Sequence, residues 1–166
     1  MVDGAVQPAP HRDVVKAAML DRLEASGRTG VGFVEGFGLG RGALAMSYNA
    51  VRENVIVVGT NDDDMSVAVN RIAELSGGVV AARDGEVVSE VALPLFGLQS
   101  DQPADVAIES FAAMDAAIAE ELGCDRQYPL FGLEFLLCPY PETPGIRICD
   151  YGLFDVGERE PLELFV

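Results

Sequence analysis

The stretch that decides the fold is residues 55–91, VIVVGTNDDDMSVAVNRIAELSGGVVAARDGEVVSEV. It opens with an unbroken apolar run at residues 55–58, which is typical of a strand buried on both faces. Thr60 and Asn61 then offer an N-cap, three aspartates fill the first helical turn, and apolar residues recur at helical spacing as far as the glycine pair 77–78. The pattern predicts a central strand followed by an amphipathic helix.

The remainder of this stretch predicts a β-hairpin. Two apolar runs, residues 79–83 and 86–91, flank the dipeptide Asp84–Gly85, which is typical of two-residue turns. Residues 14–23 fit a buried strand or a short helix about equally, and their place before a turn slightly favours a strand. Further strands are expected at residues 44–48, 131–138 and 146–149.

A second amphipathic helix is expected from a cap at Ser100 or Asp101 to Leu122, ending at Gly123. Its expected inner stripe consists of Ala107, Ile108, Phe111, Ala112, Ile118 and Leu122. Together these elements predict an α+β fold, a mixed β-sheet with two amphipathic helices packed in layers on one face. Residues 13–166 are expected to form one domain, preceded by a flexible leader at residues 1–12.

Residues 27–42, GRTGVGFVEGFGLGRG, are unusually rich in glycine. Such density fits tight strand bends or a ligand-facing loop. As a dinucleotide fingerprint, Gly38, Gly40 and Ala43 lack a clear strand before them and a helix after them. The chain also has no Gly-Lys-Ser/Thr sequence, which excludes a nucleotide-binding P-loop. Strand bends are the simpler interpretation, and phosphate cradling is the alternative.

The charge balance excludes two classes of partner. Asp and Glu number 27 against 11 Lys and Arg, so the formal net charge is −16. Nucleic acids and anionic membranes repel such a surface, and no Lys/Arg run offsets it. With no apolar run of about 18 residues and no basic-then-apolar leader, neither a transmembrane span nor a signal peptide is expected. We expect a soluble, cytoplasmic protein.

The chain offers little for catalysis or metal binding. Its single histidine, His11, lies in a proline-flanked segment, which argues against a Ser–His or Cys–His mechanism and a multi-histidine zinc centre. Cys124, Cys138 and Cys149 show no metal-binding spacing and are expected to be reduced structural thiols. The aspartates 62–64 lack the spacing of a calcium loop, so helix capping is favoured over a metal site. No catalytic residue and no metal ligand is assigned.

Polar groups around glycine turns and strand ends remain as candidates for a ligand site, because open α/β sheets often bind ligands at such positions. The candidate ligand-binding residues are Gly36, Gly38, Arg41, Ser47, Asn54, Asn61 and Asp62. Turn chemistry and helix capping explain the same residues without a ligand.

Several long segments resemble the C-terminal domain of bacterial and archaeal adenine deaminases. The similar segments, in the same order as in that family, are GVGFVEGFGLGRGALAMS, NVIVVGTNDDDMSVAVNRIAELSGGVV, DGEVVSEVALPLFGLQSD, FGLEFLLCP and DYGLFDV, spread over about residues 14–156. The resemblance implies an amidohydrolase-superfamily context, in which a metal-activated water converts adenine to hypoxanthine and ammonia. It places the metal ligands on a barrel domain that precedes the matched region. No cofactor is therefore expected on this chain, and a divalent metal (Mn, Fe or Zn) is expected in the barrel.

Two short stretches depart from the family pattern. Residues 50–54, Ala-Val-Arg-Glu-Asn, stand where family members usually carry His-Asp-Ser-His-Asn, so only Asn54 is retained. Asp21, Arg22 and Leu23 replace a Glu-Arg-His triplet, so only Arg22 is retained. The resemblance therefore implies that the fold carries over better than any role of those histidines.

Three functions compete. The preferred one is an accessory domain of an adenine deaminase, inactive alone, with a separate amidohydrolase barrel subunit as partner. The second is a free-standing module that binds a purine-like small molecule through Arg41, Arg52 and Asn54. The third is a structural domain that forms a homo-oligomer, in which the apolar tail at residues 162–166 helps to build a subunit contact.

Overall fold

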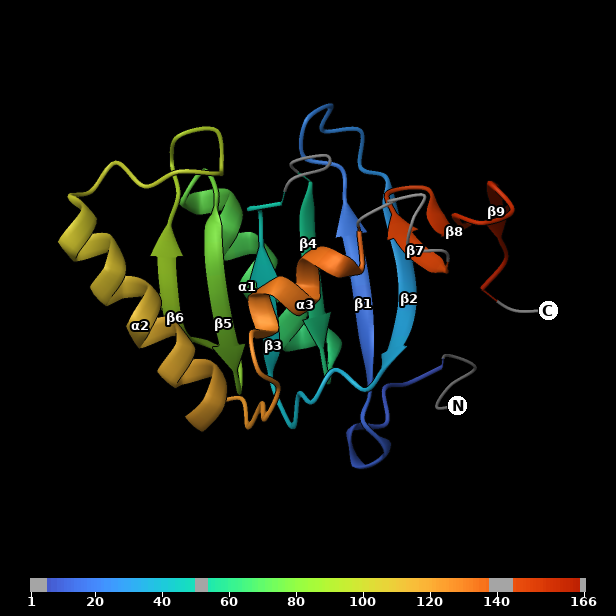
Figure 1. Cartoon of the computed structure of the whole chain (residues 1–166), viewed down its shortest axis with the longest axis horizontal. Helices are drawn as coiled ribbons and strands as arrows, with labels where there is room; N and C mark the ends of the chain where they lie inside the picture. Colours follow the sequence, from blue (N-terminus) through green and yellow to red (C-terminus); the bar gives the residue numbers. More distant parts are fainter. Residues whose placement is uncertain (1–5, 50–53, 138–144, 165–166) are drawn as a thin grey trace.

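The computed structural model describes residues 6–49, 54–137 and 145–164 of the 166-residue chain. Within them, six strands form one sheet in the order β2-β1-β4-β3-β5-β6 (Figure 1). The strands are β1 (Val14–Leu20), β2 (Thr29–Glu35), β3 (Ala43–Met46), β4 (Val55–Gly59), β5 (Gly78–Arg83) and β6 (Glu86–Ala92). The predicted central strand is confirmed, since all of β4 is buried, and so is the hairpin β5–β6. Residues 14–20 form a strand, as slightly favoured.

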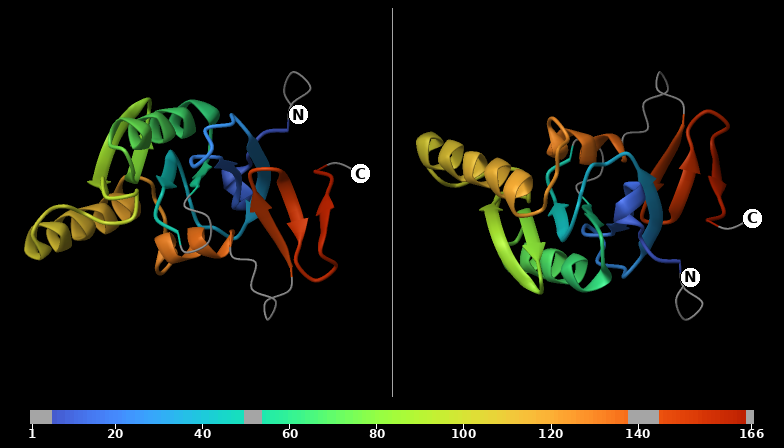
Figure 2. Two further views of the ribbon diagram at one scale, coloured as in Figure 1. Left: turned by 90° about the horizontal axis from the view of Figure 1, so that it is seen from above. Right: turned by 90° about the horizontal axis from the view of Figure 1, so that it is seen from below.

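Helices cover both faces of this sheet. Helix α1 (Asp62–Glu74) lies on one face, and α2 (Ala104–Glu120) and α3 (Pro129–Phe135) lie on the other (Figure 2). Each face has its own hydrophobic core, one containing Met65 of α1 and the other Met114 of α2 and Leu133 of α3. The α+β class is confirmed. The expectation of helices on one face is wrong, because a central strand that is apolar on both faces needs cover on both.

The strand directions also differ from the expected mixed sheet. Every strand pairing in the described segments is antiparallel. Helix α1 connects β4 to β5, which run in the same direction. These two strands are not neighbours, because β3 lies between them and runs antiparallel to both.

A second, three-stranded sheet packs on the first. In the described part of the C-terminal third, β7 (Ile146–Cys149), β8 (Gly152–Asp155) and β9 (Glu160–Leu162) form this sheet, and β7 and β8 contact β1 and β2. A Cβ on Gly30 would meet the Cys149 carbonyl oxygen at 1.8 Å, and one on Gly32 would meet Leu153 at 2.9 Å. Part of the glycine-rich run is thus strand β2, where the absence of side chains at Gly30 and Gly32 allows the second sheet to pack closely.

Three sequence predictions for the C-terminal half are wrong. Residues 131–138 were expected to form a strand, but α3 occupies residues 129–135, with Pro129 at its first turn and Tyr128 in the left-handed region at φ 56°. Helix α2 starts at Ala104 after Pro103, and not at a Ser100 or Asp101 cap. Ile108, expected on its inner stripe, is 69% exposed. A short apolar run does not distinguish a strand from a helix, and here Pro129 favours the start of a helix.

The described N-terminal residues pack against the start of β1. Pro10–Arg12 form a short 3₁₀ helix, and Ala9 pairs with Val14 across a single bridge. Cys124 is buried and Cys149 half-buried, both as free thiols, and Cys138 lies outside the described residues. In the segments that the structure describes, no helix is both long enough and apolar enough to cross a membrane.

Candidate functional site

The seven candidate residues divide between the two ends of the six-stranded sheet. The register pairs Ala43 with Gly59 and Met46 with Ile56. The segment before β3 and the segment after β4 therefore lie at one end of the sheet. The segment after β3 and the segment before β4 lie at the opposite end. Gly36, Gly38, Arg41, Asn61 and Asp62 lie at the first end, and Ser47 and Asn54 at the second. The structure thus does not bring the seven together in one cluster.

Arg41 binds the carboxyl end of α2. Its Nε donates to the carbonyl oxygen of Glu121 at 2.6 Å, and its Nη2 donates to that of Glu120 at 3.0 Å. The last carbonyls of a helix have no partner within the helix and carry partial negative charge, so a guanidinium there is stabilising. Arg83 adds a further donor to the same Glu121 carbonyl oxygen at 3.3 Å. Arg41 is therefore engaged in helix termination.

The glycine loop between β2 and β3 is held by Asp13. The amides of Gly36 and Gly38 donate to the carbonyl oxygen and to Oδ1 of Asp13, at 2.9 and 2.7 Å. Gly38 has φ 82°, and a Cβ there would meet Asp125 Oδ1 at 2.6 Å. These two amides are already bound within the protein, which favours tight bends over phosphate cradling.

The first turn of α1 forms a closed hydrogen-bonded unit. Asn61 Oδ1 accepts from the amide of Asp64 at 2.8 Å, and Asn61 Nδ2 donates to Asp64 Oδ2 at 2.7 Å. Asp64 Oδ1 accepts from the amide of Gly85 at 2.8 Å, which ties the helix to the hairpin turn, and Asp62 pairs with Lys16 at 2.5 Å. Among the described residues, no group of three or more His, Cys, Asp and Glu could hold a metal ion. Helix capping accounts for Asn61 and its neighbours.

At the opposite end of the sheet, Ser47 anchors the loop that follows β6. Its buried hydroxyl donates to the carbonyl oxygen of Gly97 at 2.7 Å and accepts from the amide of Gly78 at 2.8 Å. Arg22 lies so close to Gly97 that a Cβ there would be 2.6 Å from the central guanidinium carbon. Phe96, next to this anchor, is 81% exposed in the left-handed region at φ 59°. The hydrogen bond from Ser47 therefore holds the loop that follows β6 against the end of the sheet.

Asn54 joins the start of β4 to the end of β1. Its Oδ1 accepts from the amide of Arg22 at 3.1 Å, and its carbonyl oxygen accepts from Asn49 Nδ2 at 2.8 Å. Asn54 and Asn49 are both 3% exposed, and a buried amide is stabilised by such partners. Arg52, the other donor of the purine-binding hypothesis, lies outside the described residues.

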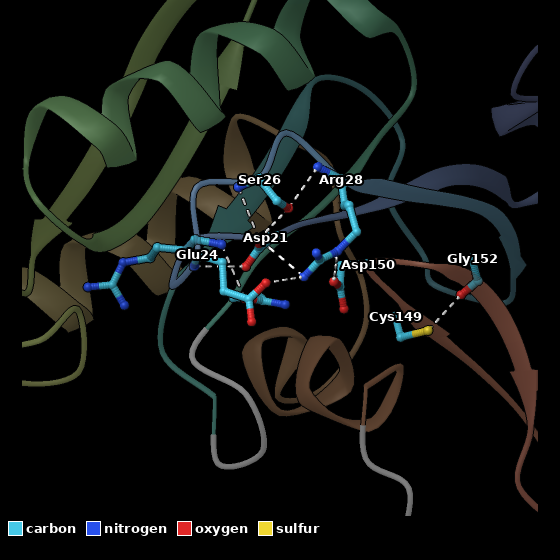
Figure 3. A network of polar contacts seen from close by, with 9 residues as sticks. Asp21, Glu24, Ser26, Arg28, Cys149, Asp150 and Gly152 are labelled. Atoms are coloured by element: carbon cyan, nitrogen blue, oxygen red, sulfur yellow. Dashed lines mark hydrogen bonds and ion pairs between the residues drawn. The ribbon is translucent and has the colours of Figure 1, made fainter.

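A polar network that the sequence did not predict lies at this same end (Figure 3). Arg28 Nε donates to Asp150 Oδ2 at 2.8 Å, and Arg28 Nη2 reaches Glu24 at 2.9 Å and Asp21 at 3.4 Å. Its guanidinium also lies 4.6 Å from the centre of the Tyr151 ring. Arg28 thereby connects the β1–β2 turn to the β7–β8 turn. These residues lie 122 positions apart, so no local pattern could have found the pair.

The network shifts the titration of its members. The Ser26 hydroxyl, 2.5 Å from Asp21 Oδ2, is the largest influence holding the pKa of Asp21 below its ordinary value, with the amides of Glu24 and Ser26 acting the same way. The hydrogen bond to Asp150, followed by that to Glu24, raises the pKa of Arg28. Both shifts favour the charged forms of Asp21 and Arg28 at neutral pH, as a structural clamp requires.

Comparison with known proteins identifies the family. Residues 1–160 match the family described as the adenine deaminase C-terminal domain. The chain belongs to that family. It is 40% identical over 164 residues to an adenine deaminase of Clostridium botulinum strain Langeland, covering 99% of this chain and 27% of that protein. It is also 40% identical over 155 residues to an adenine deaminase of Brucella melitensis biotype 1, covering 93% and 26%. The chain thus spans about a quarter of the length of these curated relatives.

Asn54 and residues 21–23, the described parts of the two stretches compared above with the family pattern, lie at one end of the sheet. Leu20, at the end of β1, pairs with Val55 at the start of β4, so the stretch after Leu20 and the stretch before Val55 meet at one end of the sheet. The hydrogen bond from Arg22 to Asn54 joins the retained residues of both motifs, and Leu23 beside them is 63% exposed. In this adenine deaminase C-terminal domain, Arg22 and Asn54 therefore share one end of the sheet. Residues 50–53 lie outside the described segments.

Proposed function

We propose that this domain is a non-catalytic part of a metal-dependent adenine deaminase. In this proposal, a preceding barrel carries the metal site and converts adenine to hypoxanthine and ammonia, and the present domain supports or closes that site. The observation that carries the proposal is the family match over residues 1–160, in relatives about four times as long as the matched region. The barrel is the partner, on the same polypeptide or on a separate one.

The described residues of this domain do not fit the catalytic metal, since no group of three or more His, Cys, Asp and Glu among them could hold an ion. The one histidine of the sequence, His11, is exposed in the 3₁₀ turn, and Asp62 and Asp64 are bound to Lys16, Asn61 and Gly85. A hydrolytic metal site needs several converging ligands and an open position for water. We therefore assign Mn, Fe or Zn to the barrel.

What this domain contributes is a fixed sheet end. Ser47 and Asn54 are buried and hydrogen-bonded, and Arg28 clamps the adjoining turn, so the described β1–β2 and β7–β8 turns and the loop that follows β6 are held at this end by hydrogen bonds and an ion pair. A site that is to be closed by a neighbouring domain benefits from such pre-organised loops. The purine-binding alternative has weaker support, because Arg41 and Asn54, two of its three donors, lie at opposite ends of the sheet.

The location that fits this proposal is the cytoplasm. Cys124 and Cys149 are free thiols, and burial raises the pKa of Cys124, which keeps that thiol protonated and unreactive. Reduced, structural thiols are typical of cytosolic proteins.

A comparison of three proteins tests the proposal. They are the isolated chain, the Clostridium botulinum relative cut before the matched region, and a chimera in which this chain replaces that region. Each is supplied with Mn²⁺, Fe²⁺ or Zn²⁺, and ammonia release from adenine is measured, with the intact relative as control. We expect no turnover by the isolated chain and more turnover by the chimera than by the truncated relative. Metal-dependent turnover by the isolated chain, or a chimera no better than the truncation, would contradict the proposal.

A further inference from the structure

Helix α1 leaves one side of its sheet face open in the described chain. It packs mainly on β3, β4, β5 and β6. The neighbouring strands β1 and β2 extend beyond it on the same face (Figure 2). There Ala18 pairs with Val31, and Leu20 pairs with Thr29. Leu20 and Val31 are both only half-buried, so apolar strand surface remains accessible beside the helix.

A groove follows this uncovered strip between α1 and strand β1. It consists of two adjoining hollows of about 370 and 290 Å³, both of which are lined by Leu20 and Val69. Its apolar lining comes from β1, β2, β4 and α1, namely Ala18, Leu20, Val31, Val57, Met65 and Val69. Charged side chains lie at its two ends, Lys16 and Asp62 at one and Asp21 and Arg22 at the other, and the uncharged polar residues Thr29, Ser66, Asn70 and Ser76 also line it. We refer to it below as the α1 groove.

The chemistry of the α1 groove suits an apolar polypeptide segment. A small polar ring such as a purine binds where a few polar groups converge on it. In this groove Lys16 is paired with Asp62, and Asp21 accepts from Ser26 and Arg28. What the groove offers is apolar surface, whose burial is favourable by roughly 25 cal/mol per Å².

The start of the domain lies beside the same groove. Ala9 pairs with Val14, so the described chain enters at the Val14 end of β1, two residues before Lys16 at the groove's end. In the relatives almost three quarters of the protein lies outside the matched region, and the family is a C-terminal domain. A preceding polypeptide therefore enters next to the α1 groove.

We infer that the α1 groove receives an apolar segment of the polypeptide that precedes this domain in a complete adenine deaminase. The inference rests on the proposed function, since that function supplies the preceding barrel. It assigns this apolar contact to the β1–β2 side of the α1 face, and not to α2.

Cysteine labelling in the chimera tests this assignment. Val31→Cys places a thiol in the groove, and Val87→Cys is the matched control, a strand valine 37% exposed on β6 and outside the groove. Each variant is labelled with a maleimide both in the isolated chain and in the chimera, and the unsubstituted proteins give the background of the native cysteines. Thr29→Cys, at the exposed rim, is a second probe should Val31→Cys fail to fold.

We expect the labelling rate at position 31 to fall about tenfold or more in the chimera, while the rate at position 87 changes by less than about twofold. Equal rates at position 31 in both proteins would overturn the inference. Protection in the isolated chain that grows with its concentration would also overturn it, in favour of a second copy. Ammonia release by the same chimera is read separately. Activity with an accessible position 31 defeats the groove assignment alone, and protection without activity defeats the proposed function alone.

Discussion

Replacing Gly30 with alanine should detach the three-stranded sheet from β2. The added Cβ would lie 1.8 Å from the carbonyl oxygen of Cys149 and 2.8 Å from the amide nitrogen of Gly152. Both are backbone atoms, so no side-chain rotation relieves the overlap. Because close carbon–oxygen contacts in proteins are about 3.3 Å or longer, the β7–β8 turn would have to move by well over an ångström.

The loss of unfolding free energy in Gly30→Ala is set by whichever of two responses costs less, backbone strain or detachment of the second sheet. Backbone displacement on this scale is expensive, because packed interiors do not deform continuously. Detachment exposes Ile148, now 5% exposed, and the half-buried Leu153. Full burial of such a side chain is worth about 1.5–3 kcal/mol, so one full and one partial loss give about 3 kcal/mol of unfolding free energy. Detachment is thus the expected response.

Urea unfolding followed by far-UV circular dichroism measures the loss, and hydrogen exchange locates it. The amide of Ile148, which donates to the Leu136 carbonyl oxygen at 3.0 Å, should exchange faster in Gly30→Ala. The matched control is Gly32→Ala, whose Cβ would meet only the flexible Leu153 side chain at 2.9 Å, for a cost of about 1 kcal/mol. The reasoning is refuted when Gly30→Ala unfolds within 1 kcal/mol of the unsubstituted chain, or costs no more than Gly32→Ala.

Substitutions at three other positions have defined outcomes. Ser26→Ala should raise the pKa of Asp21 toward its ordinary value of 3.8, measured by NMR titration. The depressed pKa of Asp21 contributes stability that is present above about pH 4 and is lost as pH falls through the pKa of the folded state. The variant should therefore lose less stability than the unsubstituted chain as the pH is lowered through this range. An unchanged acid dependence of the unfolding free energy would contradict this. Asn61→Ala should lower the unfolding free energy by about 1 kcal/mol, and Asn61→Ser should restore most of it, whereas equal losses would exclude capping. Phe96→Gly should raise the melting temperature, because it relieves an exposed side chain at φ 59°; a lower value would show that Phe96 packs favourably.

The sequence predicted best where local chemistry decides the structure. Helix α1 begins after Asn61 as expected, because the cap, the acidic first turn and the apolar spacing all agree. The Asp84–Gly85 turn was predicted for the same reason, with both residues at positive φ. The prediction of a strand at residues 131–138 was wrong because this apolar run suits a strand as well as a helix. The prediction that Ile108 faces inward was wrong because only tertiary packing determines which face of α2 is covered.

The candidate site was harder, because its geometry depends on the topology. Arg41 and Asn54 both flank glycine turns and strand ends in the sequence, yet the register of β3 and β4 separates them by the length of the sheet. Arg28 and Asp150 have no sequence signal in common and meet only because β7 and β8 pack on β2. Residue type thus predicted that polar side chains lie near the ends of strands, but it could not predict which of these side chains lie at the same end of the sheet.

The glycine-rich run of residues 27–42 contains two kinds of glycine with different physical causes. Gly30 and Gly32 lie in β2, where the second sheet leaves no room for a side chain. Gly38 and Gly42 have φ 82° and 72°, and a Cβ on Gly42 would meet the Ala82 carbonyl oxygen at 2.4 Å. In both groups the protein itself occupies the space that a ligand would need. At these four positions glycine therefore reflects close packing of β2 and the loop that follows it, and a purine or phosphate would have to displace those contacts in order to bind there.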